Sequence, residues 1–75
     1  MYIADRITVE NGKMGGRPCI RGLRITVKDV LEILASGMTH EEIFADYPAL
    51  EVEDFAAALN YAARQVDHPI VVAAE

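Results

Sequence analysis

The sequence predicts a mostly α-helical domain in which three helices follow a short two-stranded β element. The strongest observation is Thr39-His40-Glu41-Glu42, a capping box in which a threonine hydroxyl and a glutamate carboxylate satisfy each other's backbone N–H groups. A second is the segment 52–66, whose apolar residues recur at intervals of three and four, as on one face of a helix. A third is the tetrapeptide Arg-Ile-Thr-Val, which occurs at 6–9 and again at 24–27 with the alternating pattern of a strand.

Both copies of the tetrapeptide are expected to form short strands, because each carries two neighbouring β-branched residues. An antiparallel pairing, within one subunit or exchanged between two, would place four apolar side chains on one buried face: Ile7, Val9, Ile25 and Val27. Asn11-Gly12 is a hairpin turn signal, but the residues that follow it make a poor returning strand. A wider loop is therefore expected, with residues 18–20 in extended form.

The first helix is expected to begin after Thr26, which can cap it, with Asp29 in the first turn. Helical spacing relates its apolar residues, which are Val27, Val30, Leu31 and Leu34. Gly37 is placed to end the helix, because glycine readily adopts the left-handed conformation that is common just beyond a helix C-terminus.

The second helix is predicted to be short, from His40 to Asp46, because Pro48 disfavours helical geometry at Tyr47. Ile43, Phe44 and Tyr47 are expected to hold it to the core.

The third helix is predicted over residues 52–66 and is the longest. Its expected buried stripe consists of Val52, Phe55, Leu59, Ala62 and Val66. Alanines widen this stripe and would let another helix approach closely, while Glu53 and Asp54 in the first turn suit the helix dipole.

The chain divides into a single domain over 1–67, a β-hairpin plus three helices, and an extended C-terminal tail over 68–75. A domain of this size buries only about 60% of its unfolded surface, so a homodimer or higher oligomer is expected. The tail is apolar and needs a surface to lie on, in its own dimer or in a partner. Ile70, Val71 and Val72 are the expected partner-binding residues.

Charge is unevenly distributed along the chain. Residues 1–28 hold six Lys or Arg against two Asp or Glu, a balance of +4, whereas the remainder holds one against ten, a balance of −9. This segregation predicts a basic face for an anionic partner and an acidic face for a basic one. The alternative is that the acids merely favour helix starts and that the basic loop over 15–27 only joins two strands.

Residues capable of bond-breaking chemistry are scarce, so the chain is not expected to be an enzyme. His40 and His68 lie far apart in sequence, and with one cysteine they give no metal-ligand spacing, so no metal or other cofactor is expected. Cys19 is expected to be a small buried hydrophobe, with a reactive thiol among arginines as the alternative. A single cysteine and the lack of a signal-like segment or long apolar run predict a cytoplasmic protein that does not span a membrane.

Four stretches of the chain carry a family resemblance. They are the loop Gly16-x-Pro18-x-Ile20-x-Gly22-x-Arg24-Ile25-x-Val27, the turn Ala35-Ser36-Gly37-Met38-Thr39, the segment Glu42-Ile43-x-x-Asp46-Tyr47-Pro48 and the helix Asp54-x-x-Ala57-Ala58-Leu59-x-Tyr61-Ala62-Ala63. Together they resemble domain-of-unknown-function family 433 over about residues 5–65. The chain departs from the family at Leu23, usually a threonine, and at Glu51, which replaces the usual Thr or Ser cap of the third helix with a weaker one.

The resemblance implies a homeodomain-like or winged-helix-like unit of three helices behind a small β element. It also implies an antitoxin-like regulator, similar to the VapB group, that binds and inhibits a PIN-like nuclease toxin and as a dimer binds its own operator DNA. The alternative is an acidic protein-interaction adaptor without DNA binding, which the overall negative charge favours.

Charge placement indicates which residues would contact DNA. The primary set is Arg17, Arg21, Arg24 and Lys28, and the secondary set is Asn60, Arg64 and Gln65. Alanine at the three arginines is expected to abolish operator binding and leave the fold intact. The helix over 40–46, which follows the glycine turn, is acidic and would be repelled by phosphate, so it suits base reading poorly.

Overall fold

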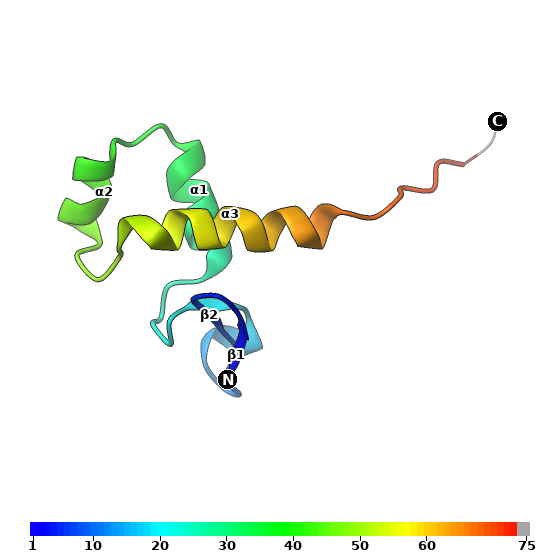
Figure 1. Cartoon of the computed structure of the whole chain (residues 1–75), viewed down its shortest axis with the longest axis horizontal. Coiled ribbons are helices and arrows are strands. Elements are labelled where there is room, and N and C mark those ends of the chain that lie inside the picture. Colours follow the sequence, from blue (N-terminus) through cyan, green and yellow to red (C-terminus); the bar gives the residue numbers. More distant parts are fainter. Residues whose placement is uncertain (74–75) are drawn as a thin grey trace.

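The computed structural model describes residues 1–73 and consists of a layer of three helices above a small antiparallel sheet (Figure 1). The strands are β1 (Tyr2–Ala4), β2 (Ile7–Thr8) and β3 (Cys19–Ile20), and the helices are α1 (Val27–Ala35), α2 (His40–Asp46) and α3 (Val52–Val66). A 3-10 turn over Met14–Gly16 lies between β2 and β3. The three predicted helices are confirmed, α2 and α3 at the expected residues.

The sheet differs from the prediction. It has three strands in the order β1-β2-β3, with Tyr2 opposite Thr8 and Ile7 opposite Ile20. The second copy of the tetrapeptide is not a strand, because only Thr26 forms an isolated bridge, with Cys19, and the next residue begins α1. The predicted pairing of the two copies, with its shared buried face, is therefore wrong.

Capping explains why identical tetrapeptides fold differently. Thr26 Oγ1 accepts a hydrogen bond from the Asp29 amide at 3.0 Å, and Asp29 Oδ2 accepts one from the Thr26 amide at 3.0 Å. This reciprocal box starts a helix directly after Thr26. The first copy has no acid three residues after its threonine, and its Thr8 hydroxyl instead accepts from the Gly22 amide at 2.8 Å.

The capping box at Thr39 is confirmed. Thr39 Oγ1 accepts from the Glu42 amide at 3.2 Å, and Glu42 Oε1 accepts from the Thr39 amide at 2.8 Å. Glu51 precedes α3 without a side-chain capping bond, as expected for a glutamate in this position. Asp54 compensates in part, since its Oδ2 accepts from the Glu51 amide at 2.8 Å.

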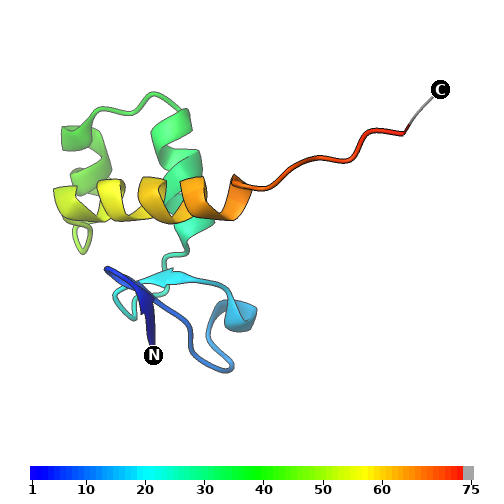
Figure 2. The same ribbon diagram turned by 45° about the vertical axis from the view of Figure 1, so that its right-hand side comes forward.

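The core lies where α1 and α3 pack together, and Figure 2 shows these helices above the sheet. Its fully buried large apolar residues are Ile7, Ile20, Val30 and Ile43. On α3 the buried residues are Asp54, Phe55, Ala57 and Ala58.

The predicted stripe of α3 is therefore largely wrong. Val52, Leu59 and Val66 are 52%, 53% and 71% exposed. The helix is apolar on two faces, and hydrophobic periodicity does not decide which of them turns inward. The decisive interaction is polar, because Asp54 joins α3 to the sheet region.

Beyond α3 the chain leaves the domain in a direction away from the sheet (Figure 1). Residues 69–73 form neither helix nor strand and are exposed. Residues 74 and 75 of the predicted tail lie outside the described residues. Over residues 1–73, none of the helices combines the length and apolar character that crossing a lipid bilayer requires.

Candidate functional site

A cluster of two arginines around one buried carboxylate connects the N-terminal third of the chain to α3. Asp54 is fully buried and accepts hydrogen bonds on Oδ1 from Arg6 at 2.9 Å and from Arg21 Nε at 3.0 Å. Its Oδ2 accepts from a second Arg21 nitrogen at 2.9 Å and from the Glu51 amide at 2.8 Å. We refer to Arg6, Arg21 and Asp54 as the Asp54 clamp.

The clamp is held from both sides by further bonds. Arg6 also pairs with Glu51 at 2.8 Å, and Arg21 donates to the Ala49 carbonyl at 2.7 Å. The Arg21 amide donates to the Arg6 carbonyl at 3.0 Å, so the two arginines are fixed relative to each other. Both have left-handed backbones, with φ of 62° at Arg6 and 42° at Arg21. Such conformations are unfavourable for arginine and persist where surrounding bonds enforce them.

Burial and hydrogen bonding act in opposite directions on Asp54. Burial disfavours the charged form and is the largest single influence, but the bonds from Arg21, the Glu51 amide and Arg6 together outweigh it. The pKa of Asp54 therefore lies below its usual value of 3.8. The same contacts raise the pKa of Arg21, chiefly through Asp54, and that of Arg6, chiefly through Glu51 and then Asp54.

This shift predicts a specific acid sensitivity. Because the pKa of Asp54 is lower in the folded than in the unfolded chain, ionisation stabilises the fold above the unfolded pKa, and that stabilisation is lost as the pH falls through the folded pKa. We expect the free energy of unfolding, measured by urea denaturation, to be level above about pH 5 and to decline below about pH 4. Asp54→Asn should flatten much of the decline, and an unchanged acid slope in that variant would contradict the assignment.

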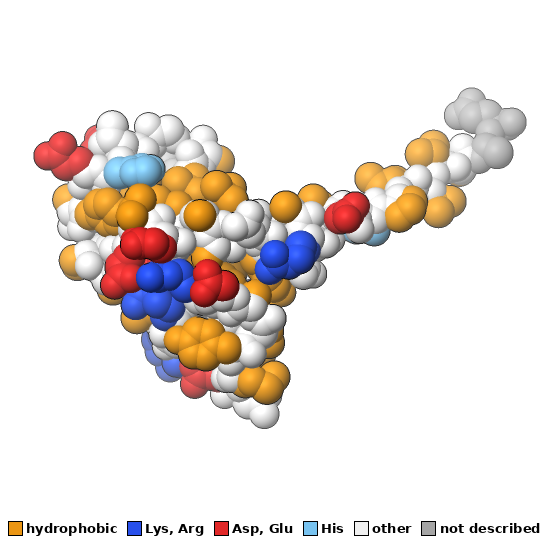
Figure 3. Space-filling model, viewed as in Figure 1, with side chains coloured by type: hydrophobic (Ala, Val, Ile, Leu, Met, Phe, Trp, Pro, Cys, Tyr) orange, Lys and Arg blue, Asp and Glu red, His pale blue; other side chains and the backbone are white. Residues whose placement is uncertain are grey.

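The clamp brings cations of the N-terminal third of the chain together with acids of the C-terminal part. Two of the six cations of residues 1–28 are neutralised by acids of the C-terminal part, and Lys13 pairs locally with Glu10 at 2.9 Å. Lys and Arg side chains accordingly border Asp and Glu side chains in the middle of the face in Figure 3. The predicted segregation into a basic and an acidic face is therefore reduced in the folded domain.

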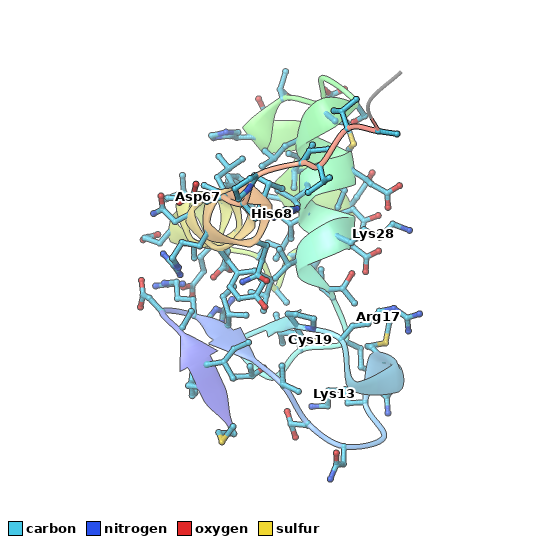
Figure 4. All side chains as sticks on the ribbon, turned by 90° about the vertical axis from the view of Figure 1, so that its right-hand side faces the viewer. Lys13, Arg17, Cys19, Lys28, Asp67 and His68 are labelled. Atoms are coloured by element: carbon cyan, nitrogen blue, oxygen red, sulfur yellow. The ribbon has the colours of Figure 1, made fainter. Side chains whose placement is uncertain are left out.

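Three of the predicted DNA-binding cations remain exposed. Within residues 1–73, neither Arg17 nor Arg24 lies within ion-pair distance of a carboxylate. Lys28 forms a long ion pair of 3.8 Å with Glu32, and its side chain stays 77% exposed. Arg17 donates to the Met14 carbonyl at 3.0 Å, which holds its guanidinium near the 3-10 turn. Arg17 and Lys28 extend from the same side of the molecule (Figure 4).

Arg17 and Lys28 also line an apolar groove of about 300 Å³ between the loop before β3, α1 and α3. The apolar residues of the groove are Pro18, Val27, Leu31, Tyr61, Ala62 and Val66. Gln65, one of the secondary candidates, lines it as well. The C-terminal tail departs immediately beyond Val66, so the groove, two exposed cations and the tail occur together.

The other predicted residues lie elsewhere. Asn60 and Arg64 line a separate polar hollow with Asp5, Glu53, Ala56 and Ala57, which shares no residue with the apolar groove. Arg21 is in the clamp, where its Nε and one terminal nitrogen bind Asp54. This geometry argues against the expectation that Arg21 can be replaced without damage to the fold. The predicted set is thus divided among the groove, the clamp and the polar hollow, with Arg24 exposed outside all three.

The tail residues predicted to bind a partner are fully available to one. Ile70, Val71 and Val72 are 81%, 95% and 81% exposed. Apolar side chains follow the tail in Figure 3, outside the domain. Three adjacent exposed β-branched residues are unusual for a surface that meets only water.

The few potential reactive groups are dispersed. Cys19 is buried, as expected for a small apolar residue, and its sulfur lies 3.3 Å from the Arg17 carbonyl. His40 is exposed, with its ring 4.8 Å from that of Phe55, and His68 lies in the tail beyond α3. Among residues 1–73 no three His, Cys, Asp or Glu side chains gather in a way that could hold a metal ion.

The Asp54 clamp is the feature that sequence reasoning missed. Acidic residues in the first turn of a helix are ordinarily solvated, and the position of Asp54 in the sequence predicts only a favourable interaction with the helix dipole. Its arginine partners are 33 and 48 residues away, beyond any local pattern.

Comparison with known proteins identifies the family. A crystal structure of a DUF433 member protein from Anabaena variabilis is similar to this chain, with a TM-score of 0.70 and 34% identity over 79% of this chain and 58% of that one. The chain thus spans less than two thirds of that protein's length. Comparison with curated proteins gives no match. The model of the family described as protein of unknown function (DUF433) matches residues 7–62, and the chain therefore belongs to the DUF433 family.

Proposed function

We propose that this protein is an antitoxin-like regulator that binds and inhibits a PIN-like nuclease toxin through its exposed tail. The observation that carries the proposal is the tail itself, in which Ile70, Val71 and Val72 are at least 81% exposed. An extended apolar segment of this kind can add to the surface of a partner and bury its side chains there. In this proposal the domain works by binding in the cytoplasm and carries out no catalysis.

A co-purification experiment tests the proposal. The reading frame next to this gene should encode a short nuclease with several carboxylates, and the two products should be expressed together with a tag on the nuclease alone. We expect the full chain to stay bound to the immobilised nuclease during a high-salt wash and to elute with it, because salt screens ion pairs but not apolar contacts. Failure of the two products to associate would contradict the proposal.

Operator binding as a dimer is the second part of the proposal. In it, the three helices act as a homeodomain-like or winged-helix-like unit, and phosphates are held by the exposed cations Arg17, Arg24 and Lys28. Asn60, Arg64 and Gln65 of α3 are secondary contacts. Arg21 is left out of this revised set because the clamp occupies its guanidinium.

The triple variant Arg17→Ala, Arg24→Ala, Lys28→Ala is expected to lose operator affinity without losing stability, since all three residues are exposed. Each phosphate contact removed should lower the slope of log affinity against log salt by about one. A fluorescence anisotropy titration of operator DNA at several salt concentrations measures both quantities. Arg64→Ala, a change at the separate polar hollow, is the comparison and should lose less. An unchanged salt slope in the triple variant would remove these cations from the DNA interface.

One observation favours the alternative of an acidic adaptor without DNA binding. The polar residues of α2 include Glu41, Glu42 and Asp46, and all three are exposed. They would repel a phosphate backbone and attract a basic protein surface. A gel shift with the promoter of the protein's own operon separates the two functions, because only the regulator retards that DNA.

A further inference from the structure

The third helix has an apolar face that the domain leaves uncovered. Val52, Leu59 and Val66 are each more than half exposed, and Ala56 and Ala63 lie exposed between them. These five residues, the outer stripe, follow one another at intervals of four and three, so they form one line along the helix. The stripe faces away from the buried side, which carries Phe55 and Ala58.

The outer stripe is nearly symmetric about Leu59. Read in either direction, it runs valine, alanine, leucine, alanine, valine. In a two-fold symmetric dimer the same patch meets itself, so such a surface must be self-complementary. An antiparallel pair of α3 helices crossing at Leu59 would bring each Val52 onto the partner's Val66, and the alanines would allow the two backbones to come close.

The charges beside the stripe favour the antiparallel direction. Glu53 and Arg64 both line the polar hollow on one flank of α3, together with Asn60, and within residues 1–73 neither is within ion-pair distance of an opposite charge. Antiparallel pairing places Glu53 of each helix near Arg64 of the other, forming two reciprocal ion pairs. Parallel pairing about a two-fold axis along the helices would place this flank of the two copies on opposite sides of the interface, so neither residue would meet its counterpart or form an ion pair.

From this pattern we propose that α3 is the dimerisation element. Its outer stripe packs against the outer stripe of α3 in a second copy, with the two helices antiparallel and crossing at Leu59. The inference deepens the dimer of the proposed function by naming its surface. Dimerisation is measured on the isolated chain, so a failure to dimerise is distinguishable from a failure to bind the nuclease. The tail and the groove of Arg17 and Lys28 remain outside this interface apart from Val66, which belongs to both.

Sedimentation equilibrium of the full chain tests the proposal. The native chain should have twice the monomer mass of 8.2 kDa. Leu59→Lys, which opposes two ammonium groups at the symmetry axis, should be monomeric and at least 100-fold weaker in association. Since Leu59 is 53% exposed, this variant should retain the helical circular dichroism of the native chain. Glu41→Lys, an equivalent change of an exposed residue on α2, is the control and should remain a dimer.

A charge exchange tests the direction of packing. Glu53→Arg and Arg64→Glu should each weaken the dimer about tenfold, and the double variant should regain native association because the ion pairs re-form reversed. In a parallel dimer residues 53 and 64 do not meet across the interface, so neither the single losses nor the recovery in the double variant would be seen. A monomeric native chain, a dimeric Leu59→Lys variant, or single variants that the double change does not rescue would each overturn the proposal.

Discussion

Asp54→Ala is expected to cost about 3–5 kcal/mol of unfolding free energy, because it leaves the part-buried guanidinium groups of Arg6 and Arg21 without their shared carboxylate. It also removes the acceptor for the Glu51 amide at the start of α3. A domain of this size has only about 5–15 kcal/mol of stability, so the variant should be largely unfolded or melt far below the native protein. Urea denaturation followed by circular dichroism measures the difference.

Glu41→Ala is the matched control for this experiment. Glu41 is an acid in the first turn of α2, but it is exposed and lies outside both the clamp and the proposed dimer interface. Its replacement should change the unfolding free energy by no more than about 0.5 kcal/mol. Equal effects of the two substitutions would show that Asp54 acts only through the helix dipole, and the clamp would then have no special role in the fold.

The tail variant Ile70→Ser, Val71→Ser, Val72→Ser is expected to abolish nuclease inhibition while leaving the domain unchanged. The three side chains are at least 81% exposed, so the native fold loses nothing when they become polar. In a complex each would bury apolar surface worth about 1.5 kcal/mol or more, and the three together predict a loss of affinity of at least 100-fold. Isothermal titration calorimetry with the purified nuclease measures this loss.

The control for the tail keeps its apolar character. Ile70→Val, Val71→Ile, Val72→Ile preserves β-branched side chains at all three positions and should bind within about tenfold of the native chain. Thermal denaturation should give the same melting temperature for all three proteins. Native affinity in the serine variant would exclude the tail as the nuclease-binding segment.

The helices could be predicted because their ends are encoded locally. Thr39 and Glu42 stand three residues apart and satisfy each other's amides, so the beginning of α2 follows from four adjacent residues. Pro48 similarly ends α2 through its effect on the preceding residue. These are short-range interactions that need no knowledge of the tertiary structure.

The two errors in the fold arise from competition between local patterns and distant contacts. Residues 24–27 have a strand pattern, yet the capping box of Thr26 and Asp29 begins a helix within them. On α3, two apolar faces compete, and the one beside Asp54 is buried because Arg6 and Arg21 approach it from the sheet region. Local spacing contains no information on partners so far along the chain.

The same limit affected the candidate site. Charge counting grouped Arg17, Arg24 and Lys28 with Arg21, although the first three are exposed and Arg21 has a structural role. Only the tertiary structure separates them, because all four residues belong to one basic segment. The two hollows beside α3 likewise divide Gln65 from Asn60 and Arg64, which are close in sequence.

Titration of nuclease activity with the full chain tests the proposed function most directly. The proposal is that this domain acts by binding a nuclease and carries out no chemistry itself. Purified product of the neighbouring reading frame should be assayed on RNA while increasing amounts of the chain are added. The account predicts that cleavage falls linearly to zero at one chain per nuclease and that the chain alone cleaves nothing. Full nuclease activity in the presence of excess chain would contradict it.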